Sequence, residues 1–233
     1  MIEIIAFDAD DTLWENEALY IKIQEHLAGL LAAYGTQEEI LAALYKIEMK
    51  NMPLYGYGIK AFGLSLIETA IAISQEKIRV GDIKTILDMV NHMLTYTLPV
   101  YPGVESTLQQ LSKKYPLMMI TKGDLLDQEM KINRSGLRRY FTHIEVVAKK
   151  ETDTYKTIME RHQIPPDSFL MVGNSLRSDV LPVVSLGGIG VLYVNEVSWA
   201  HENEIDPAHQ ALPYHSIHSL PELIPLLDQL NLQ

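Results

Sequence analysis

A short apolar run near the start of the chain ends abruptly in three carboxylates. The run from Ile4 to Phe7 has no polar side chain, which is typical of a strand buried on both faces of a parallel sheet. Asp8, Asp10 and Asp11 follow it directly. In open α/β sheets, functional groups gather beyond the carboxyl ends of the strands. The segment therefore predicts a parallel sheet with an acidic site at one edge, the alternative being a solvated acidic turn.

Such a group of charges is informative because neighbouring carboxylates repel one another. Clusters of this kind persist mainly where a bound cation or a shared proton offsets the repulsion. The three aspartates thus suggest a cation site or a pair of carboxyls with different protonation states.

From Pro99 onward, helical and strand patterns alternate along the chain. We expect strands at Pro116–Ile120, His143–Ala148, Phe169–Val172 and Ile189–Val194, with a short strand near Ser216 and a final helix over Leu220–Leu230. Alternation of this kind predicts an α/β fold, a Rossmann-like doubly wound parallel sheet with helices on both faces and right-handed crossovers.

The segment between the first strand and Pro99 has a different character. Apolar residues recur at helical spacing over Trp14–Tyr34, from Thr36 to about Lys50, over Ile59–Ser74 and over Gly81–Tyr96. Thr36 and Glu39 predict a capping box, whereas residues 51–58, with one proline and two glycines, predict a break. We therefore expect an α/β core of residues 1–14 and 99–233, and an inserted all-helical cap domain of residues 15–98.

Composition narrows the classes of protein and partner. The chain has 233 residues, 47% of them hydrophobic and 21% charged, which is typical of a globular protein. A net charge of −11 argues against binding nucleic acid or anionic membranes. There is no cysteine, and no apolar run reaches the ~20 residues that span a bilayer. We expect a soluble cytoplasmic protein, monomeric or homodimeric, that acts on a small metabolite.

The sequence Asp8-Ala9-Asp10-Asp11-Thr12 resembles the first motif, Asp-x-Asp-x-Thr, of the haloacid dehalogenase superfamily of phosphohydrolases. The resemblance implies that Asp8 is the nucleophile, that Asp10 is the general acid and base, and that Thr12 contributes to substrate binding. A carboxylate that attacks phosphorus gives an acyl phosphate, so one difficult displacement becomes two easier ones. A second carboxyl can protonate the leaving alkoxide and later accept a proton from water.

Two further segments resemble the second and third motifs. An apolar stretch ends at Thr121, whose hydroxyl, with Lys122 and the flexible Gly123, is suited to bind phosphoryl oxygens. Lys149 and Lys150 follow the strand predicted to end at residue 148, and either ammonium would offset negative charge on a transferring phosphate. We favour Lys150, because its spacing to Tyr155 resembles that in related enzymes.

The stretch Gly173–Asp179 resembles the fourth motif, Gly-Asp-x-x-x-x-Asp, with Asn174 in place of the first aspartate. A site formed by Asp8, the backbone carbonyl of Asp10, Asn174 and Asp179 would suit Mg²⁺, which binds few protein carboxylates and keeps several waters. Asn174 supplies a neutral oxygen, so the sequence predicts a Mg²⁺ site of modest affinity.

The specificity of such an enzyme would be determined largely by the cap. Within it, residues 55–60 combine tyrosines and glycines with Lys60, a candidate substrate-binding residue. The same segment equally suits tyrosine packing and a helix start. The sequence does not identify the phosphate ester.

The main prediction is a Mg²⁺-dependent hydrolase of small phosphomonoesters that forms an aspartyl phosphate. One alternative is a 2-haloacid dehalogenase. The segment Gly173-Asn174-Ser175 resembles the metal-free loop of those enzymes. Halide leaves without a proton, so dehalogenases lack the second carboxyl of the first motif. The presence of Asp10 therefore favours hydrolysis of a phosphate ester over dehalogenation. Phospho-accepting signalling domains are typically shorter and uncapped, and a binding protein of the same fold without turnover is a further alternative.

Overall fold

The computed structural model describes residues 1–194 and 212–231. Its centre is a six-stranded sheet of order β3-β2-β1-β4-β5-β6 in which every neighbouring pair is parallel. The strands are β1 (Ile4–Phe7), β2 (Leu117–Lys122), β3 (His143–Val147), β4 (Phe169–Gly173), β5 (Ile189–Tyr193) and β6 (His215–Ile217). The α/β fold class and all the predicted strands are confirmed.

The apolar composition of the central strands explains their place in the sheet. In register, Ile5 of β1 lies beside Leu117 on one neighbour and Leu170 on the other, and all three are fully buried. A strand buried on both faces has no need of alternating polar residues. The first strand, although only four residues long, is therefore the middle of the sheet and carries its acidic end to the centre of one edge.

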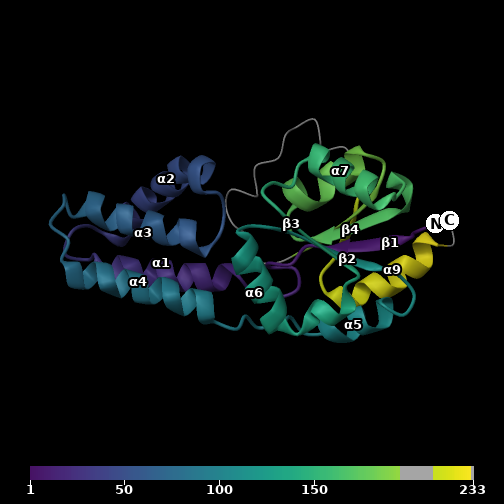
Figure 1. Cartoon of the computed structure of the whole chain (residues 1–233), viewed down its shortest axis with the longest axis horizontal. Helices are drawn as coiled ribbons and strands as arrows, with labels where there is room; N and C mark the ends of the chain where they lie inside the picture. The colour runs from purple at the N-terminus through teal and green to yellow at the C-terminus, as the bar shows by residue number, and fades with distance from the viewer. Residues whose placement is uncertain (195–211, 232–233) are drawn as a thin grey trace. The chain divides into compact units, whose positions relative to one another are not determined.

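Helices cover both faces of this sheet (Figure 1). On one side lies α7 (Thr152–His162), and on the other lie α5 (Val104–Leu111) and α9 (Leu223–Leu230). The remaining helical elements here are α6 (Leu125–Ser135), a π-helical turn at Leu176–Val180, α8 (Leu181–Ser185) and 3₁₀ turns at Leu137–Tyr140, Pro166–Ser168 and Leu220–Glu222. The π-helical turn carries Asp179 and leads directly into α8.

The helical block consists of α1 (Glu17–Leu30), α2 (Gln37–Tyr55), α3 (Ile59–Ile73) and α4 (Val80–Thr95). The predicted capping box at the start of α2 is present, since the Thr36 hydroxyl accepts from the Glu39 amide at 3.3 Å and the Glu39 carboxylate accepts from the Thr36 amide at 2.8 Å.

The break predicted at residues 51–58 is present but shorter: α2 continues to Tyr55 with Pro53 inside it, and only residues 56–58 separate it from α3. Asn51 is buried, and its side-chain amide donates to the Ser65 hydroxyl of α3 at 3.2 Å. This packing against a neighbouring helix outweighs the local preference for a turn. The helix ends only at Gly56, whose φ of 72° is readily adopted by glycine.

The chain divides into two compact units, which are described separately. The first comprises Met1–Glu17, Leu98–Lys122 and the chain from Glu129 onward; the second comprises Ala18–Thr97 together with Gly123–Gln128. The sequence placed residues 123–128 with the α/β core, whereas their contacts group them with the helices. Within the described residues, no helix has the length and apolar character needed to cross a membrane.

Candidate active site

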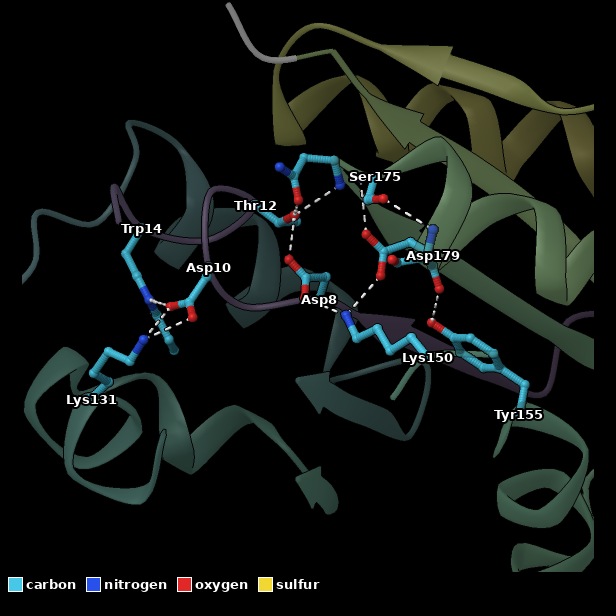
Figure 2. A network of polar contacts seen from close by, with 11 residues as sticks. Asp8, Asp10, Thr12, Trp14, Lys131, Lys150, Tyr155, Ser175 and Asp179 are labelled. Carbon is cyan, nitrogen blue, oxygen red and sulfur yellow. Dashed lines mark hydrogen bonds and ion pairs between the residues drawn. The ribbon is translucent and has the colours of Figure 1, made fainter. Parts of the chain in front are cut away.

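Asp8 lies immediately beyond β1, at the centre of the sheet edge. Its backbone amide donates to the Val172 carbonyl at 2.8 Å, so the pairing with β4 extends to this residue. Its side chain is almost completely buried. One carboxylate oxygen accepts from the Thr12 hydroxyl at 3.0 Å, and the other forms an ion pair with Lys150 (Figure 2).

Lys150 bridges two buried carboxylates. Its ammonium contacts Asp8 and also Asp179, the latter at 2.7 Å, and only 2% of its side chain is exposed. Lys149, the alternative raised by the sequence, is 70% exposed and pairs with Glu151 at 3.5 Å. Of the two adjacent lysines, therefore, Lys150 is the one that lies against Asp8.

Burial strongly affects the ionisation of this group. Removal from water raises the pKa of Asp8 to about 7, with the charge of Asp179 adding to the rise and Lys150 opposing it. Burial by itself lowers the pKa of Lys150, but Asp179 and Asp8 outweigh that effect and raise it. One ammonium between two carboxylates leaves the cluster with excess negative charge, which a cation would offset.

The loop after β4 holds Asp179 in place. One Asp179 oxygen accepts from the Ser175 amide at 3.0 Å, and the Tyr155 hydroxyl donates to the Ser178 carbonyl at 2.9 Å. A Cβ atom on Gly173 would lie 2.3 Å from Asp179 Cγ, so only glycine fits there. Lys150 and Tyr155 thus contact adjacent residues of this segment, Lys150 through the Asp179 carboxylate and Tyr155 through the Ser178 carbonyl.

Thr12 joins the first loop to the fourth. Besides contacting Asp8, its hydroxyl accepts from the Asn174 backbone amide at 3.1 Å and lies 3.3 Å from the Asn174 side-chain oxygen. The residue is fully buried. Its predicted contribution to substrate binding stays a prediction; in this structure it aligns the Asp8 carboxylate with the Asn174 loop.

The second motif follows β2. Thr121 is buried at the end of the strand, and Lys122 is its last residue. Gly123 has a φ of 151°, and a Cβ atom there would approach Gln128 Nε2 to 3.0 Å. The predicted role of Thr121, Lys122 and Gly123 in binding phosphoryl oxygens stays a prediction.

Asp10 has partners that the sequence did not reveal. Its carboxylate accepts from the Trp14 indole at 2.7 Å and from the Lys131 ammonium at 2.7 and 2.9 Å. Lys131 comes from α6, 121 positions further along the chain, and no spacing or motif connects the two residues. Only the tertiary structure shows that this lysine belongs beside the second aspartate.

Asp11, the third carboxylate, has a local role. It adopts a φ of 59° and accepts from the backbone amides of Asn16 at 2.9 Å and Glu17 at 3.1 Å, at the start of α1. Burial raises the pKa of Asp11 to about 6, and burial together with the Asp11 charge raises the pKa of Glu17 to about 7. Asp11 therefore caps the start of α1.

Lys60 lies in the second unit, at the start of α3. Its ammonium pairs with Asp124 at 2.8 Å, and half of its side chain is exposed. Nearby, the Ile59 amide donates to Asp127 at 3.4 Å. The predicted role of Lys60 in substrate binding stays a prediction, and the ion pair shows which contact it makes in this structure.

The oxygen groups beside Asp8 fit a small hard cation. Asp8 and Asp179 lie on either side of the Lys150 ammonium, and the Asn174 side chain lies beside Thr12, so the predicted ligand set of these three residues and the Asp10 carbonyl stays a prediction. Among the residues that the structure describes, no three carboxylates or imidazoles form a metal-binding cluster. Mg²⁺ does not require one, because it commonly takes one or two carboxylates and retains water. The excess negative charge around Asp8 is consistent with such an ion.

Comparison with known proteins places this geometry in a family. The model of the haloacid dehalogenase-like hydrolase family matches residues 2–187. The chain is 30% identical to the pyrimidine 5′-nucleotidase YjjG of Escherichia coli, covering 96% of each protein. It is 25% identical to a glyceraldehyde 3-phosphate phosphatase of Pyrococcus furiosus, covering 99% of this chain and 95% of that protein.

A solved structure agrees with these sequence matches. The haloacid dehalogenase-like family hydrolase from Xanthomonas campestris superimposes with a TM-score of 0.85 at 33% identity, covering 98% of this chain and 92% of that one. With the family model extending from the first strand through the loop that holds Asp179, the chain belongs to the haloacid dehalogenase-like hydrolase family.

Proposed function

We propose that the protein is a phosphatase that hydrolyses small phosphomonoesters with Mg²⁺, through an aspartyl phosphate on Asp8. The observation that carries the proposal is the pair formed by a buried Asp8 held by Lys150 and a second carboxyl, Asp10, two residues further on. Dehalogenation needs no proton donor for the departing halide, whereas loss of an alkoxide does.

The reaction has two steps, each using both aspartates. In the first, an Asp8 oxygen forms a bond to phosphorus while the bond from phosphorus to the leaving oxygen breaks, and the proton of Asp10 passes to that oxygen. In the second, Asp10 takes a proton from water as the water attacks the phosphoryl group, and Asp8 is released as a carboxylate.

The remaining residues stabilise the charge that moves during these steps. The Lys150 ammonium contacts Asp8 and would lie beside the transferring phosphoryl group. The Thr121 hydroxyl and the amides near Lys122 and Gly123 are suited to bind the phosphoryl oxygens. When bound by Asp8, Asn174, Asp179 and the Asp10 carbonyl, Mg²⁺ would neutralise charge on the phosphate.

The substrate class follows from chemistry and from relatives. The names of two similar proteins specify a pyrimidine nucleotide and a phosphorylated triose as substrates. Both substrates are small phosphate monoesters, and we propose the same class here. Lys60 at the start of α3 is the candidate specificity residue, since its exposed ammonium suits a second polar group on the substrate. We further propose a cytoplasmic protein, monomeric or homodimeric.

The test is a panel of sugar phosphates, nucleotides, phosphoglycolate and haloacids, assayed with Mg²⁺ and with chelator. We expect Mg²⁺-dependent phosphate release from at least one ester and no halide release. Asp8→Asn should lose nearly all turnover, and mass spectrometry of acid-quenched wild type should detect a phosphoryl group on Asp8. Halide release, or phosphate release that Asp8→Asn retains, would contradict the proposal.

A further inference from the structure

Lys131 carries a buried ammonium, and it lies outside the four motifs recognised in the sequence. It lies on α6, and only 7% of its side chain is exposed. Its three N–H groups match three acceptor contacts: the two Asp10 oxygens at 2.7 and 2.9 Å and the Asn16 side-chain oxygen at 3.2 Å. A buried charge of this kind is costly unless it is fully paired, and here each donor has an acceptor.

The partner of this ammonium is itself held firmly. The Asp10 carboxylate also accepts from the Trp14 indole at 2.7 Å, and the Trp14 side chain is fully buried. Bridges to the backbone at Asp10 and at Val100 fix the Trp14 main chain. Figure 2 shows the carboxylate pointing toward Lys131 and Trp14, while Asp8 points toward Lys150 and Thr12. Asp10 is therefore oriented by two residues that do not touch Asp8.

We infer that Lys131 is a positioning residue for Asp10, a role that rests on the phosphatase reaction proposed above. When the bond from phosphorus to the leaving oxygen breaks, the Asp10 proton passes to that oxygen and a carboxylate remains. Hydrogen bonds from the ammonium and the indole are strongest to that charged form. Together the ammonium and the indole hold both Asp10 oxygens in one orientation, so the proton is transferred from a fixed position.

The inference makes a prediction that depends on the leaving group. A nitrophenolate leaves without a proton, whereas an alkoxide needs one. Lys131→Met should therefore lower kcat on an alkyl phosphate by about tenfold or more, a part of the 10²–10⁴-fold typical of general acid catalysis. On p-nitrophenyl phosphate the same variant should stay within about threefold of wild type, because that ester gains little from an acid.

Three further variants separate positioning from general damage. Lys131→Arg keeps the charge and should recover most of the alkyl phosphate activity. Trp14→Phe removes the indole donor, together with part of a fully buried ring, and should reproduce part of the leaving-group effect. Lys149→Met, which removes an exposed lysine, should match wild type on both esters. Thermal denaturation of each variant checks the fold.

The decisive measurement is a double-mutant cycle, because the inferred effect acts through Asp10. In the Asp10→Asn background, Lys131→Met should have little further effect on kcat for the alkyl phosphate. An equal loss on both esters, no loss on either, or an undiminished loss in the Asp10→Asn background would overturn the inference. If Lys131→Met does not fold, Trp14→Phe with an unchanged ratio between the two esters would overturn it. Failure of wild type to release phosphate from any ester would refute the proposed phosphatase instead.

Discussion

The amide of Asn174 occupies the place where the family motif carries a carboxylate, and it interacts with Thr12 through both its backbone and its side chain. The proposed Mg²⁺ site then has only Asp8 and Asp179 as charged ligands. Fewer charged ligands weaken the binding of a hard cation. With a neutral side chain at position 174, the proposed site would also carry less negative charge and repel an incoming phosphate less.

We predict that Asn174→Asp binds Mg²⁺ more tightly by about 1–3 kcal/mol, the scale of an interaction with a charged group in a partly desolvated site. Calorimetric titration of Mg²⁺ without substrate measures this, and turnover need not rise because the added charge repels phosphate. Asp179→Asn is the matched control and should weaken binding. Unchanged affinity in both variants would place the metal ligands elsewhere.

At the scale of single residues, the sequence was most informative where residues are close in the chain. Asp8, Thr12 and Asp179 lie within six residues after strands that hydrophobic patterning locates. Lys150 was favoured over Lys149 because its spacing to Tyr155 resembles that in related enzymes. Lys131 could not be predicted, because its contact with Asp10 depends on how α6 packs beside the acidic loop. Burial of a lysine is a tertiary property that no local pattern encodes.

Among the elements, the end of β4 shows how tightly a strand positions the site. Gly173 leaves room for Asp179, whose Cγ would lie 2.3 Å from a Cβ atom at that position. We predict that Gly173→Ala displaces Asp179, weakens its contact with Lys150 and lowers kcat at least about tenfold, since misplacement by about 1 Å can cost 10²-fold.

The matched control for this change is Gly29→Ala in α1, where nothing lies within 4 Å of an added Cβ atom. That variant should keep full activity and gain up to about 1 kcal/mol of stability, because alanine is preferred in helices. Steady-state kinetics and chemical denaturation measure both variants. Wild-type kcat in Gly173→Ala would show that the close packing against Asp179 is unimportant.

The start of α3 carries the specificity prediction. Lys60→Ala should change the ranking among natural esters more than it changes hydrolysis of p-nitrophenyl phosphate, because contacts remote from phosphorus can orient the reacting centre. Asp124→Asn is the control, since it removes the partner of the ion pair and keeps the ammonium. A uniform loss on every ester, or the same change in ranking from both variants, would exclude Lys60 as a direct specificity residue.

Element boundaries were predicted best where a local signal coincides with a tertiary one. The Thr36 and Glu39 capping box fixed the start of α2. Its end was predicted about five residues too early, because the buried contact between Asn51 and Ser65 keeps the helix going through Pro53 to the glycine at position 56. A tertiary contact also decides where residues 123–128 belong. They group with the helical unit and not with the α/β core, because Asp124 and Asp127 contact the start of α3.

At the scale of the whole molecule, three carboxyls near the acidic loop have raised pKa values in the folded state. Burial raises those of Asp8 and Glu17 to about 7 and that of Asp11 to about 6. In the unfolded chain these groups lose their protons near pH 4. Between these values the folded protein holds more protons than the unfolded one, so its stability must fall as the pH rises.

Other carboxyls act in the opposite direction, but at lower pH. Hydrogen bonds and ion pairs lower the pKa values of Glu39, Asp82 and Asp124, and their contribution is lost only as the pH falls toward and below 4. The window from about pH 5 to about pH 7 therefore reports on the acidic loop.

We predict that the free energy of unfolding of the metal-free protein decreases across this window, by up to about 1.4 kcal/mol per pH unit for each extra proton held. Asp8→Asn removes the largest buried contribution and should flatten the dependence, whereas the exposed Glu15→Gln should not.

Mg²⁺ favours the ionised carboxylate, so saturation with it should also flatten the dependence and add about 2.7 kcal/mol at a hundredfold excess over Kd. Urea denaturation at several pH values measures the free energy of unfolding for wild type, Asp8→Asn and Glu15→Gln in chelator, and for wild type in Mg²⁺. Equal slopes for wild type and Asp8→Asn would show that the Asp8 carboxyl is ionised in the folded protein throughout this range.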